Sequence, residues 1–273
     1  MNHISTRGRR ALAGAVSFCL AQLLLALMPC NDGWAGADDL IFGKPDPFDR
    51  LLVRTGYTCG YSASDRQPRW TSYVLTAAEL TNSIVSRAGC AFRTDPTVPG
   101  VPATPEDYLR SGYDRGHIAP AADMRWSPLA MGESFLMSNM SPQRPGFNRG
   151  IWSHLEAETR RIALERGSVC VISGPVFSEA DTNSIGRSRV RIPGRFFKVI
   201  YDGCSTNGQA IAFILPNSGS DEPLAAYACS VDDVERETGL DLLDALEDEA
   251  ESRIESERPD PVAWGLEPAT EGQ

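Results

Sequence analysis

Histidine is the natural starting point for chemistry, because the chain of 273 residues contains only three. His117 ends the run Asp114-Arg115-Gly116-His117, which places a carboxylate, a guanidinium and an imidazole within four residues. An imidazole is substantially neutral at pH 7 and can take a proton from water, as general-base catalysis requires. The alternative is a turn with a hydrogen-bonded histidine. The run taken alone leaves these two interpretations about equally weighted.

A second cluster of polar residues, 31 positions further along, shifts that balance. Asn148, Trp152 and Glu156 are four residues apart, so on a helix they share one face. Asn148 by itself predicts a helix N-cap. Its amide oxygen is also a suitable ligand for Mg²⁺, and Glu156 could hold one of the waters that this ion keeps. Arg160, one turn further on, could face a phosphate, whereas His154 points away from Asn148 by ~240° around the helix.

The elements that must position these residues follow from hydrophobic patterning and from turn residues. Runs rich in β-branched and aromatic residues predict strands at residues 51–62, 69–75, 134–140, 169–177, 196–202 and 209–215. Helical periodicity and caps predict helices that start near Thr104, that span 128–133 and 148–166, and that form an acidic end at 231–257. No regular βαβ alternation occurs. We therefore expect a mixed α/β (α+β) fold with a mostly antiparallel sheet.

The first 37 residues have the features of a signal peptide. Three arginines precede an apolar run from Ala11 to Met28, and Ala35-Gly36-Ala37 offers a small-residue cleavage site. An uncleaved membrane anchor is the alternative. We favour cleavage, and so expect a secreted or periplasmic protein with no stable membrane association. Residues 38–258 then form one domain, and residues 259–273 a disordered acidic tail.

The net charge of −10 at first argues against nucleic acid as a partner. Residues 230–273, however, hold 15 acidic and 3 basic side chains, whereas residues 38–229 hold 20 of each. Nearly all the bases are arginine, the side chain best shaped to bind phosphate. The acidic end is interpreted as a solubilising surface in preference to a face that repels nucleic acid. The basic stretch from Arg187 to Lys198 either extends a phosphate-binding groove or is a solvated strand face, with equal weight.

Five cysteines follow residue 37, enough for two disulfides in an oxidising compartment. They are Cys59, Cys90, Cys170, Cys204 and Cys229. We prefer a Cys204–Cys229 pair, then Cys59–Cys90, with Cys170 as a buried free thiol in an apolar run. No closely spaced Cys/His cluster occurs, which argues against structural zinc.

Together the motifs closely resemble the DNA/RNA non-specific endonuclease family, which belongs to the ββα-metal, or His-Me finger, nucleases and is related to mitochondrial endonuclease G. The resemblance rests on the runs Asp114-Arg115-Gly116-His117, Asn139-Met140-Ser141-Pro142-Gln143 and Asn148-Arg149-Gly150-Ile151-Trp152 with Leu155-Glu156. Weaker similarity surrounds these runs, from about residue 50 to residue 240. The family implies a ββα finger, with His117 on a strand and Asn148 on a helix, inside a layered α/β/α fold.

The resemblance also implies roles for individual residues. His117 is expected to be the general base, and Asn148 the single direct ligand of a hydrated Mg²⁺, for which Mn²⁺ could substitute. Glu156 is expected to contact the metal through water. Asp114 is expected to orient the site, and the phosphate-binding arginines are Arg93 and Arg115, with Arg160 as a further candidate.

The sequence therefore predicts a secreted, Mg²⁺-dependent endonuclease that cuts DNA and RNA with little sequence preference, because metal and arginines address phosphate rather than bases. One alternative is a phosphodiesterase for a narrower substrate, such as a small or lipid phosphodiester. Another is a non-catalytic nuclease-like protein that binds nucleic acid, which is disfavoured because the base, the metal ligand and the arginines are all present. A homodimer and an inhibitor protein remain open as partners.

Overall fold

The computed structural model describes residues 40, 43–82, 84–203, 205 and 207–268. These residues belong to one compact unit, 34–273, and the expected signal peptide at residues 1–37 lies outside them. Within the described ranges, no helix combines the length and the apolar character needed to cross a membrane.

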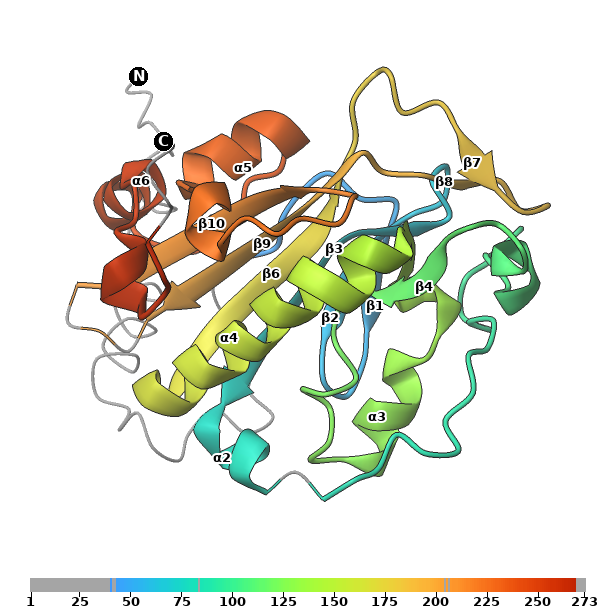
Figure 1. The fold of residues 1–273 in the computed structure, drawn as a ribbon, viewed down its shortest axis with the longest axis horizontal. Helices are drawn as coiled ribbons and strands as arrows, with labels where there is room; N and C mark the ends of the chain where they lie inside the picture. The colour runs from blue at the N-terminus through green and yellow to red at the C-terminus, as the bar shows by residue number, and fades with distance from the viewer. Residues whose placement is uncertain (1–39, 41–42, 83, 204, 206, 269–273) are drawn as a thin grey trace, which may run out of the picture. The chain divides into compact units, whose positions relative to one another are not determined.

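A seven-stranded sheet forms the centre of this unit (Figure 1). Every neighbouring pair of strands is antiparallel, which confirms the sheet type predicted from the sequence. In spatial order the strands are β1 (Arg50–Val53), β2 (Thr58–Ser62), β3 (Gln67–Thr76), β6 (Ser168–Val176), β9 (Arg195–Asp202), β10 (Gln209–Pro216) and β11 (Ala228–Cys229).

Helices cover both faces of this sheet, because alternate residues of its strands point to opposite sides. Along β6, Val171 packs in the same apolar cluster as Trp152 of helix α4 (Trp152–Arg166). Its neighbour Ile172 packs in the cluster that contains Val234 of α5 (Val231–Thr238) and Ile254 of α6 (Asp248–Ser256). In Figure 1, α4 crosses the sheet, and α5 and α6 lie away from α4. The layered α/β/α arrangement is therefore confirmed.

A small hairpin beside the sheet carries the first motif. Strand β4 (Asp114–His117) pairs with β5 (Met140–Gln143), so that Asp114 lies opposite Gln143 and His117 opposite Met140. Between them lies α3 (Pro128–Ser134), capped by the Ser127 side chain. After β5 the chain enters a π-helical turn, Phe147–Ile151, that leads directly into α4. The hairpin and α4 form the expected ββα unit.

The remaining elements are short and connect the larger ones. They are α2 (Ala77–Thr81), the 3-10 helices Pro105–Tyr108, Met137–Asn139, Leu224–Tyr227 and Pro261–Trp264, and the pair β7 (Ser184–Ile185) and β8 (Val190–Arg191). The helix start expected near Thr104 is a 3-10 turn with a capping box. The strand expected at 134–140 is wrong, because a 3-10 turn occupies residues 137–139 and pairing begins only at Met140.

Two expectations for the C-terminal end are corrected. The continuous helix 231–257 is broken, because Gly239 adopts a left-handed conformation (φ 67°) that ends α5, and α6 starts only at Asp248. The disordered tail from residue 259 is wrong as far as residue 268. Trp264 and Leu266 are buried, and the Arg166 guanidinium lies 3.9 Å from the Trp264 ring centroid. Residues 269–273 lie outside the described part.

The cysteine predictions have mixed outcomes. Cys59 and Cys90 are both free thiols, so the Cys59–Cys90 disulfide is wrong. Cys170 is buried in β6, as its apolar surroundings predicted. The preferred Cys204–Cys229 pair includes Cys204, which lies outside the described residues.

Candidate active site

The His117 ring lies between two aromatic side chains. Its centroid is 5.5 Å from that of Phe92 and 5.0 Å from that of Phe135, which it meets edge-on. The ring is half-buried, and its Nε2 atom is buried with no hydrogen-bond partner among the described residues. Burial, aided by the positive charge of Arg87, lowers the pKa of His117 to about 3. The imidazole is therefore neutral at pH 7, in the state that can accept a proton.

Arginines surround this aromatic pair. The Arg115 guanidinium lies 4.5 Å from the centroid of Phe92, and that of Arg87 lies 5.7 Å from Phe135. Arg93 is exposed, and its Nη1 donates to the carbonyl of Gly132 at 2.6 Å. The site therefore has a cationic rim suited to phosphate. Arg87 was missed in the sequence, because the segment around it matches no motif and only the fold brings it near His117.

Gly116 is required by a close approach. A Cβ atom on this residue would lie 2.1 Å from the side-chain Oε1 of Gln143, on the facing strand of the hairpin. The glycine of the Asp-Arg-Gly-His run therefore makes room for Gln143, whereas the sequence suggested only flexibility. Just after His117, the side chain of Asn139 exchanges two 2.9 Å hydrogen bonds with the backbone of Ala119. This contact fixes the chain on the C-terminal side of the histidine.

Asp114 joins the two motifs directly. Its carboxylate accepts a hydrogen bond from Asn148 Nδ2 at 2.9 Å and a two-point contact from Arg149, at 2.8 and 2.7 Å. Partial burial disfavours the charged carboxylate, but the hydrogen bonds from Arg149 and Asn148 hold the pKa of Asp114 below its usual range. The bond to Asp114 distinguishes the two ends of the Asn148 amide. Its nitrogen is engaged, and its oxygen has no hydrogen-bond partner in the described chain.

Asn148 lies inside the π-helical turn and does not cap the helix. Its backbone N–H donates to the carbonyl of Arg144, and its side chain bonds Asp114 and not the first turn of α4. The turn widens at Gly150, which has non-helical angles (φ −107°, ψ −114°). Single π turns are frequent at functional sites. The N-cap alternative for Asn148 is therefore wrong.

Glu156 lies deeper, in a network of charged groups below α4. Arg160 donates to Asp123 at 2.9 Å, and the Tyr73 hydroxyl donates to the other Asp123 oxygen at 2.8 Å. Burial raises the pKa of Glu156 to about 7, against the opposing charge of Lys198. No hydrogen bond joins Glu156 to Asn148 in the part of the chain that is described. The role of Glu156 in holding a metal-bound water therefore stays a prediction. Arg160 is paired with Asp123, and its contact with a phosphate also stays a prediction.

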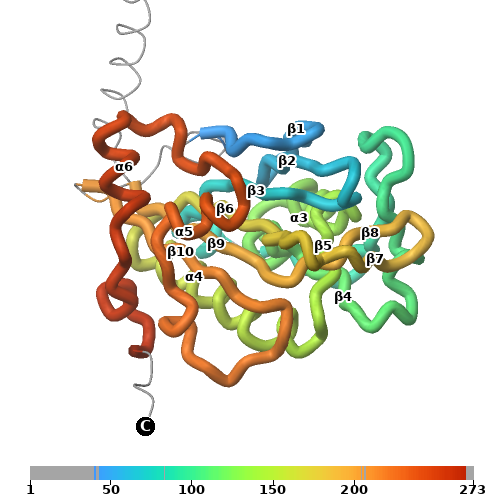
Figure 2. The backbone as a smooth tube through the Cα atoms, turned by 90° about the horizontal axis from the view of Figure 1, so that it is seen from above, coloured from blue at the N-terminus to red at the C-terminus, as the bar shows by residue number. Residues whose placement is uncertain are grey.

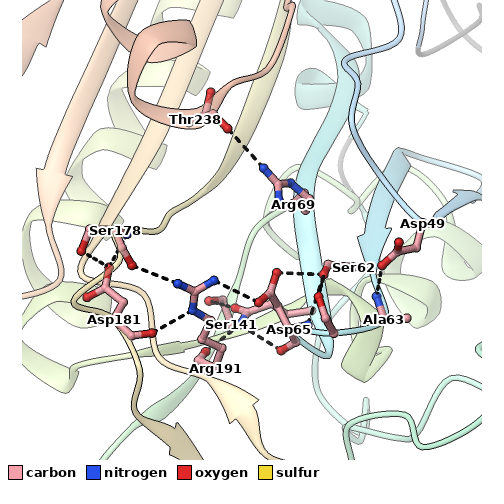
Figure 3. Close-up of polar contacts among 12 residues, drawn as sticks. Asp49, Ser62, Ala63, Asp65, Arg69, Ser141, Ser178, Asp181, Arg191 and Thr238 are labelled. Carbon is pink, nitrogen blue, oxygen red and sulfur yellow. Dashed lines mark hydrogen bonds and ion pairs between the residues drawn. The ribbon is translucent and has the colours of Figure 1, made fainter.

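The basic stretch from Arg187 to Lys198 does not form one surface. Lys198 is fully buried and donates to Ser173 at 2.7 Å, so neither a groove nor a solvated face describes it. Arg191 binds Asp65 and the carbonyls of Ser178 and Asp181, as Figure 3 shows. Arg195 pairs with Glu237. Only Arg187 and Arg189 are exposed without an ion pair among the described contacts.

His154 lies outside this arrangement. Its side chain is 62% exposed on α4 and approaches Glu158 at 3.9 Å. Of the two histidines that the structure describes, His117 alone lies on the strand of Asp114, three residues further along.

Comparison with known proteins decides the family. Residues 36–249 match the family model described as DNA/RNA non-specific endonuclease. The chain belongs to this family. The family and its enzyme class, metal-dependent hydrolysis by an endonuclease, are those that the sequence motifs predicted.

Named relatives support the assignment. The chain is 38% identical over 222 residues to Nuclease C1 of Cunninghamella echinulata var. echinulata, covering 76% of this chain and 88% of that protein. It is 35% identical over 204 residues to human Endonuclease G, mitochondrial, covering 70% and 68%. It is also 35% identical over 221 residues to zebrafish (Danio rerio) Nuclease EXOG, mitochondrial, covering 76% of this chain but only 64% of that protein's length.

A solved structure shows the same fold. It is described as the crystal structure of an EndoG/EndoGI complex that reveals the mechanism of EndoG inhibition. The match has a TM-score of 0.70 and 31% identity, and covers 76% of this chain and 91% of the other. The comparisons also correct one expectation. Several relatives are named as mitochondrial nucleases, which contradicts the secreted or periplasmic location expected from the N-terminal sequence.

Proposed function

We propose that this chain hydrolyses phosphodiester bonds inside DNA and RNA, with Mg²⁺ and without strong sequence preference. The observation that carries the proposal is the hydrogen bond from Asn148 to Asp114. It joins the two motifs at one point, three residues from a neutral histidine and beside a cationic rim.

His117 would act as the general base. Its imidazole can accept a proton from the attacking water, because burial keeps the ring unprotonated at neutral pH. The contacts with Phe92 and Phe135 limit the orientations of the ring. The water oxygen would then attack phosphorus, and the 3′-oxygen would leave.

The residues fit a hard divalent metal. The Asn148 amide nitrogen is occupied by Asp114, so the amide oxygen, a ligand that Mg²⁺ accepts, is the atom available for binding. Asp114 would thus set the orientation of the ligand, and Glu156 would hold a metal-bound water. Bound there, Mg²⁺ would supply charge stabilisation for the phosphate and the leaving oxygen. Mn²⁺ has the same preference for oxygen ligands and could replace it.

Arginines would bind the substrate phosphates. Arg93 and Arg115 are the members predicted from the motifs, and the structure adds Arg87 beside Phe135. Phosphate contacts carry little base information, so these groups favour cleavage with little regard to sequence. Arg160 would contribute through Asp123 to the position of Glu156 as well as, or in place of, a phosphate contact.

A protein inhibitor is a further candidate partner, since the solved structure similar to this chain is of such a complex. Two other functions are weaker. A narrower phosphodiesterase would need a site matched to a small substrate. A non-catalytic binding protein would not need the neutral histidine and the oriented amide that are both present.

The test is cleavage by the purified protein of circular plasmid DNA, of RNA and of bis(p-nitrophenyl) phosphate. Each is measured with Mg²⁺ and with EDTA. We expect both polymers to be cut in Mg²⁺, a much slower reaction with the small diester, and none in EDTA. Activity confined to the small diester would favour the narrower phosphodiesterase, and binding without cleavage would favour the non-catalytic protein.

A further inference from the structure

A cluster of five carboxylates lies between α5 and α6, away from the candidate active site. Asp232 and Glu235 come from α5, Glu251 and Glu255 from α6, and Asp241 from the loop between these helices. The cluster forms two groups of three that share Glu255. Within each group the ligand oxygens lie within 4.8 Å of one another. In Figures 1 and 2, α6 and β4 lie on opposite sides of the view.

Glu255 is the unusual member, because its carboxylate is buried and one of its oxygens has no hydrogen-bond partner among the described residues. The residue is only 7% exposed. A backbone hydrogen bond from Leu243 reaches its carboxylate, but the Oε1 atom is buried and has no hydrogen-bond partner among the described residues. Buried polar atoms in native proteins almost always have a partner. Because both groups of carboxylates share Glu255, this buried oxygen indicates a missing positive group.

The basic residues of this region do not supply that group. Arg236 and Arg258 both contact Asp233, and Arg253 donates to the carbonyl of Asn207. Burial and the negative charges of Glu235, Glu251 and Asp232 raise the pKa of Glu255 to about 8. A bound cation would offset this repulsion among the carboxylates.

We propose that this cluster is a Ca²⁺ site in which Glu255 is the shared ligand. The donors are all hard oxygens, which Ca²⁺ prefers. The ligands come from two helices and a loop, and the flexible coordination of Ca²⁺ by six to eight oxygens accommodates such a set. Mg²⁺ demands near-ideal octahedral geometry and is less suited to it. The site is distinct from Asn148 and does not depend on the proposed nuclease function.

Such an ion would act on the fold. It would join α5, α6 and the loop that holds Asp241, at the point where Gly239 interrupts the helical segment. A ligand that binds only the folded state raises its stability in proportion to the logarithm of ligand concentration. Ca²⁺ should therefore raise the unfolding temperature of the whole protein.

Thermal unfolding of the full chain tests this proposal. The protein is first freed of metal with EDTA, and CaCl₂ is then titrated to a few millimolar excess. We expect the midpoint to rise by about 5 °C, the order given by saturating a site in a domain of this size. MgCl₂ should give a smaller shift. Calorimetric titration with CaCl₂ should show heat of binding in the wild type.

Variants test whether the Ca²⁺ shift arises at this cluster or elsewhere in the protein. Glu255→Gln should lose the Ca²⁺ shift and, in EDTA, should unfold at a higher temperature than the wild type, because it removes an acid that burial and its acidic neighbours destabilise. Glu222→Gln, at an exposed loop position, is the matched control and should keep the shift. Asn148→Ala should also keep it, which distinguishes failure here from failure of the proposed nuclease site.

The proposal is overturned by a wild-type midpoint that does not respond to Ca²⁺, or by a shift that survives in Glu255→Gln. Should that variant not fold, Asp241→Asn provides the decision, since it removes an exposed ligand. A reduced shift in Asp241→Asn supports the site, and an unchanged shift contradicts it.

Discussion

Asp114 and Glu255 are both carboxylates close to other charged groups, and their surroundings shift their pKa values in opposite directions. Asp114 accepts hydrogen bonds from Asn148 and Arg149, which hold its pKa below the usual range. Glu255 faces Asp232, Glu235 and Glu251, and its pKa is raised to about 8. The first carboxylate is stable as an anion and can orient a neighbour. The second needs a proton or a cation.

The formal net charge of the whole chain likewise does not describe the charge at the candidate active site. The net charge of −10 arises from a C-terminal segment whose helix α6 lies on the opposite side of the view from β4, the strand that ends at His117 (Figure 2). Near His117, Arg87 acts on the ring by its positive charge, and Arg115 lies over the adjacent Phe92. Because exposed charges are screened over about 8–10 Å in salt, the local arrangement matters more for substrate than the total.

The largest effect should come from His117→Ala, which removes the proposed base from the site with the cationic rim. We expect plasmid nicking at saturating Mg²⁺ to slow by about two to four orders of magnitude, the usual scale for general-base catalysis. His154→Ala is the matched control, because that side chain is exposed on α4, and it should cut at the wild-type rate. Nicking by His117→Ala at a near-normal rate would show that another group accepts the proton.

Asp114→Asn should weaken metal binding while leaving the proposed ligand in place. The variant loses the negative charge that fixes the Asn148 amide, and such orienting partners typically contribute about 10–100-fold to metal affinity. The Mg²⁺ concentration for half-maximal nicking should rise accordingly. Asp221→Asn, at an exposed loop position, should leave it unchanged. An unaltered Mg²⁺ requirement in Asp114→Asn would remove its orienting role.

Two arginines should separate substrate binding from stability. Arg93 is exposed and unpaired by any carboxylate in the described chain, so Arg93→Ala should lower turnover about tenfold or more without changing the unfolding temperature. Arg160 is paired with the buried Asp123, so Arg160→Ala should lower the unfolding temperature. Nicking rates and thermal melts of both variants check this. Normal turnover together with a lower unfolding temperature in Arg93→Ala would contradict the phosphate role of Arg93.

The smallest effect concerns the acidic region and the pH dependence of stability. The folded-state pKa of Glu255, about 8, lies above its ordinary value of 4.5, so folding favours the protonated form. The stabilisation is complete below about pH 4.5 and is lost as the pH rises to about 8. In EDTA, the wild-type melting temperature should therefore fall by several degrees relative to Glu255→Gln between about pH 5 and pH 8. Parallel curves would show that Glu255 does not titrate in this range.

The sequence predicted the candidate site well where its residues are close together in the chain. The runs at 114–117 and 148–156 are local patterns, and strand pairing to Met140–Gln143 brings them together in a way that the ββα family resemblance anticipates. Arg87 and the burial of Lys198 were not predictable in the same way. Their environments depend on contacts with Phe135 and Ser173, which lie 48 and 25 residues away.

The helix boundaries predicted from the sequence differ from those in the structure. The pattern after Phe147 is helical, but the wide turn at Gly150 places Asn148 in π geometry. At the C-terminal end, the acidic periodicity runs through Gly239, while the fold uses this glycine to end α5. The apolar Trp264 and Leu266 were too few to predict order, yet both are buried against the domain. Gly150 and Gly239 thus change the helix through their backbone conformation, whereas Trp264 and Leu266 are ordered by tertiary contacts.

The most direct test of the proposed metal mechanism is a Mg²⁺ titration of plasmid nicking by the wild type and by Asn148→Ala. The proteins are freed of metal with EDTA and the rate is measured as MgCl₂ is added. We expect no nicking without metal, and a Mg²⁺ midpoint at least tenfold higher in Asn148→Ala, since this variant lacks the amide oxygen that Asp114 orients. Cleavage that persists in EDTA, or identical Mg²⁺ midpoints for the two proteins, would contradict it.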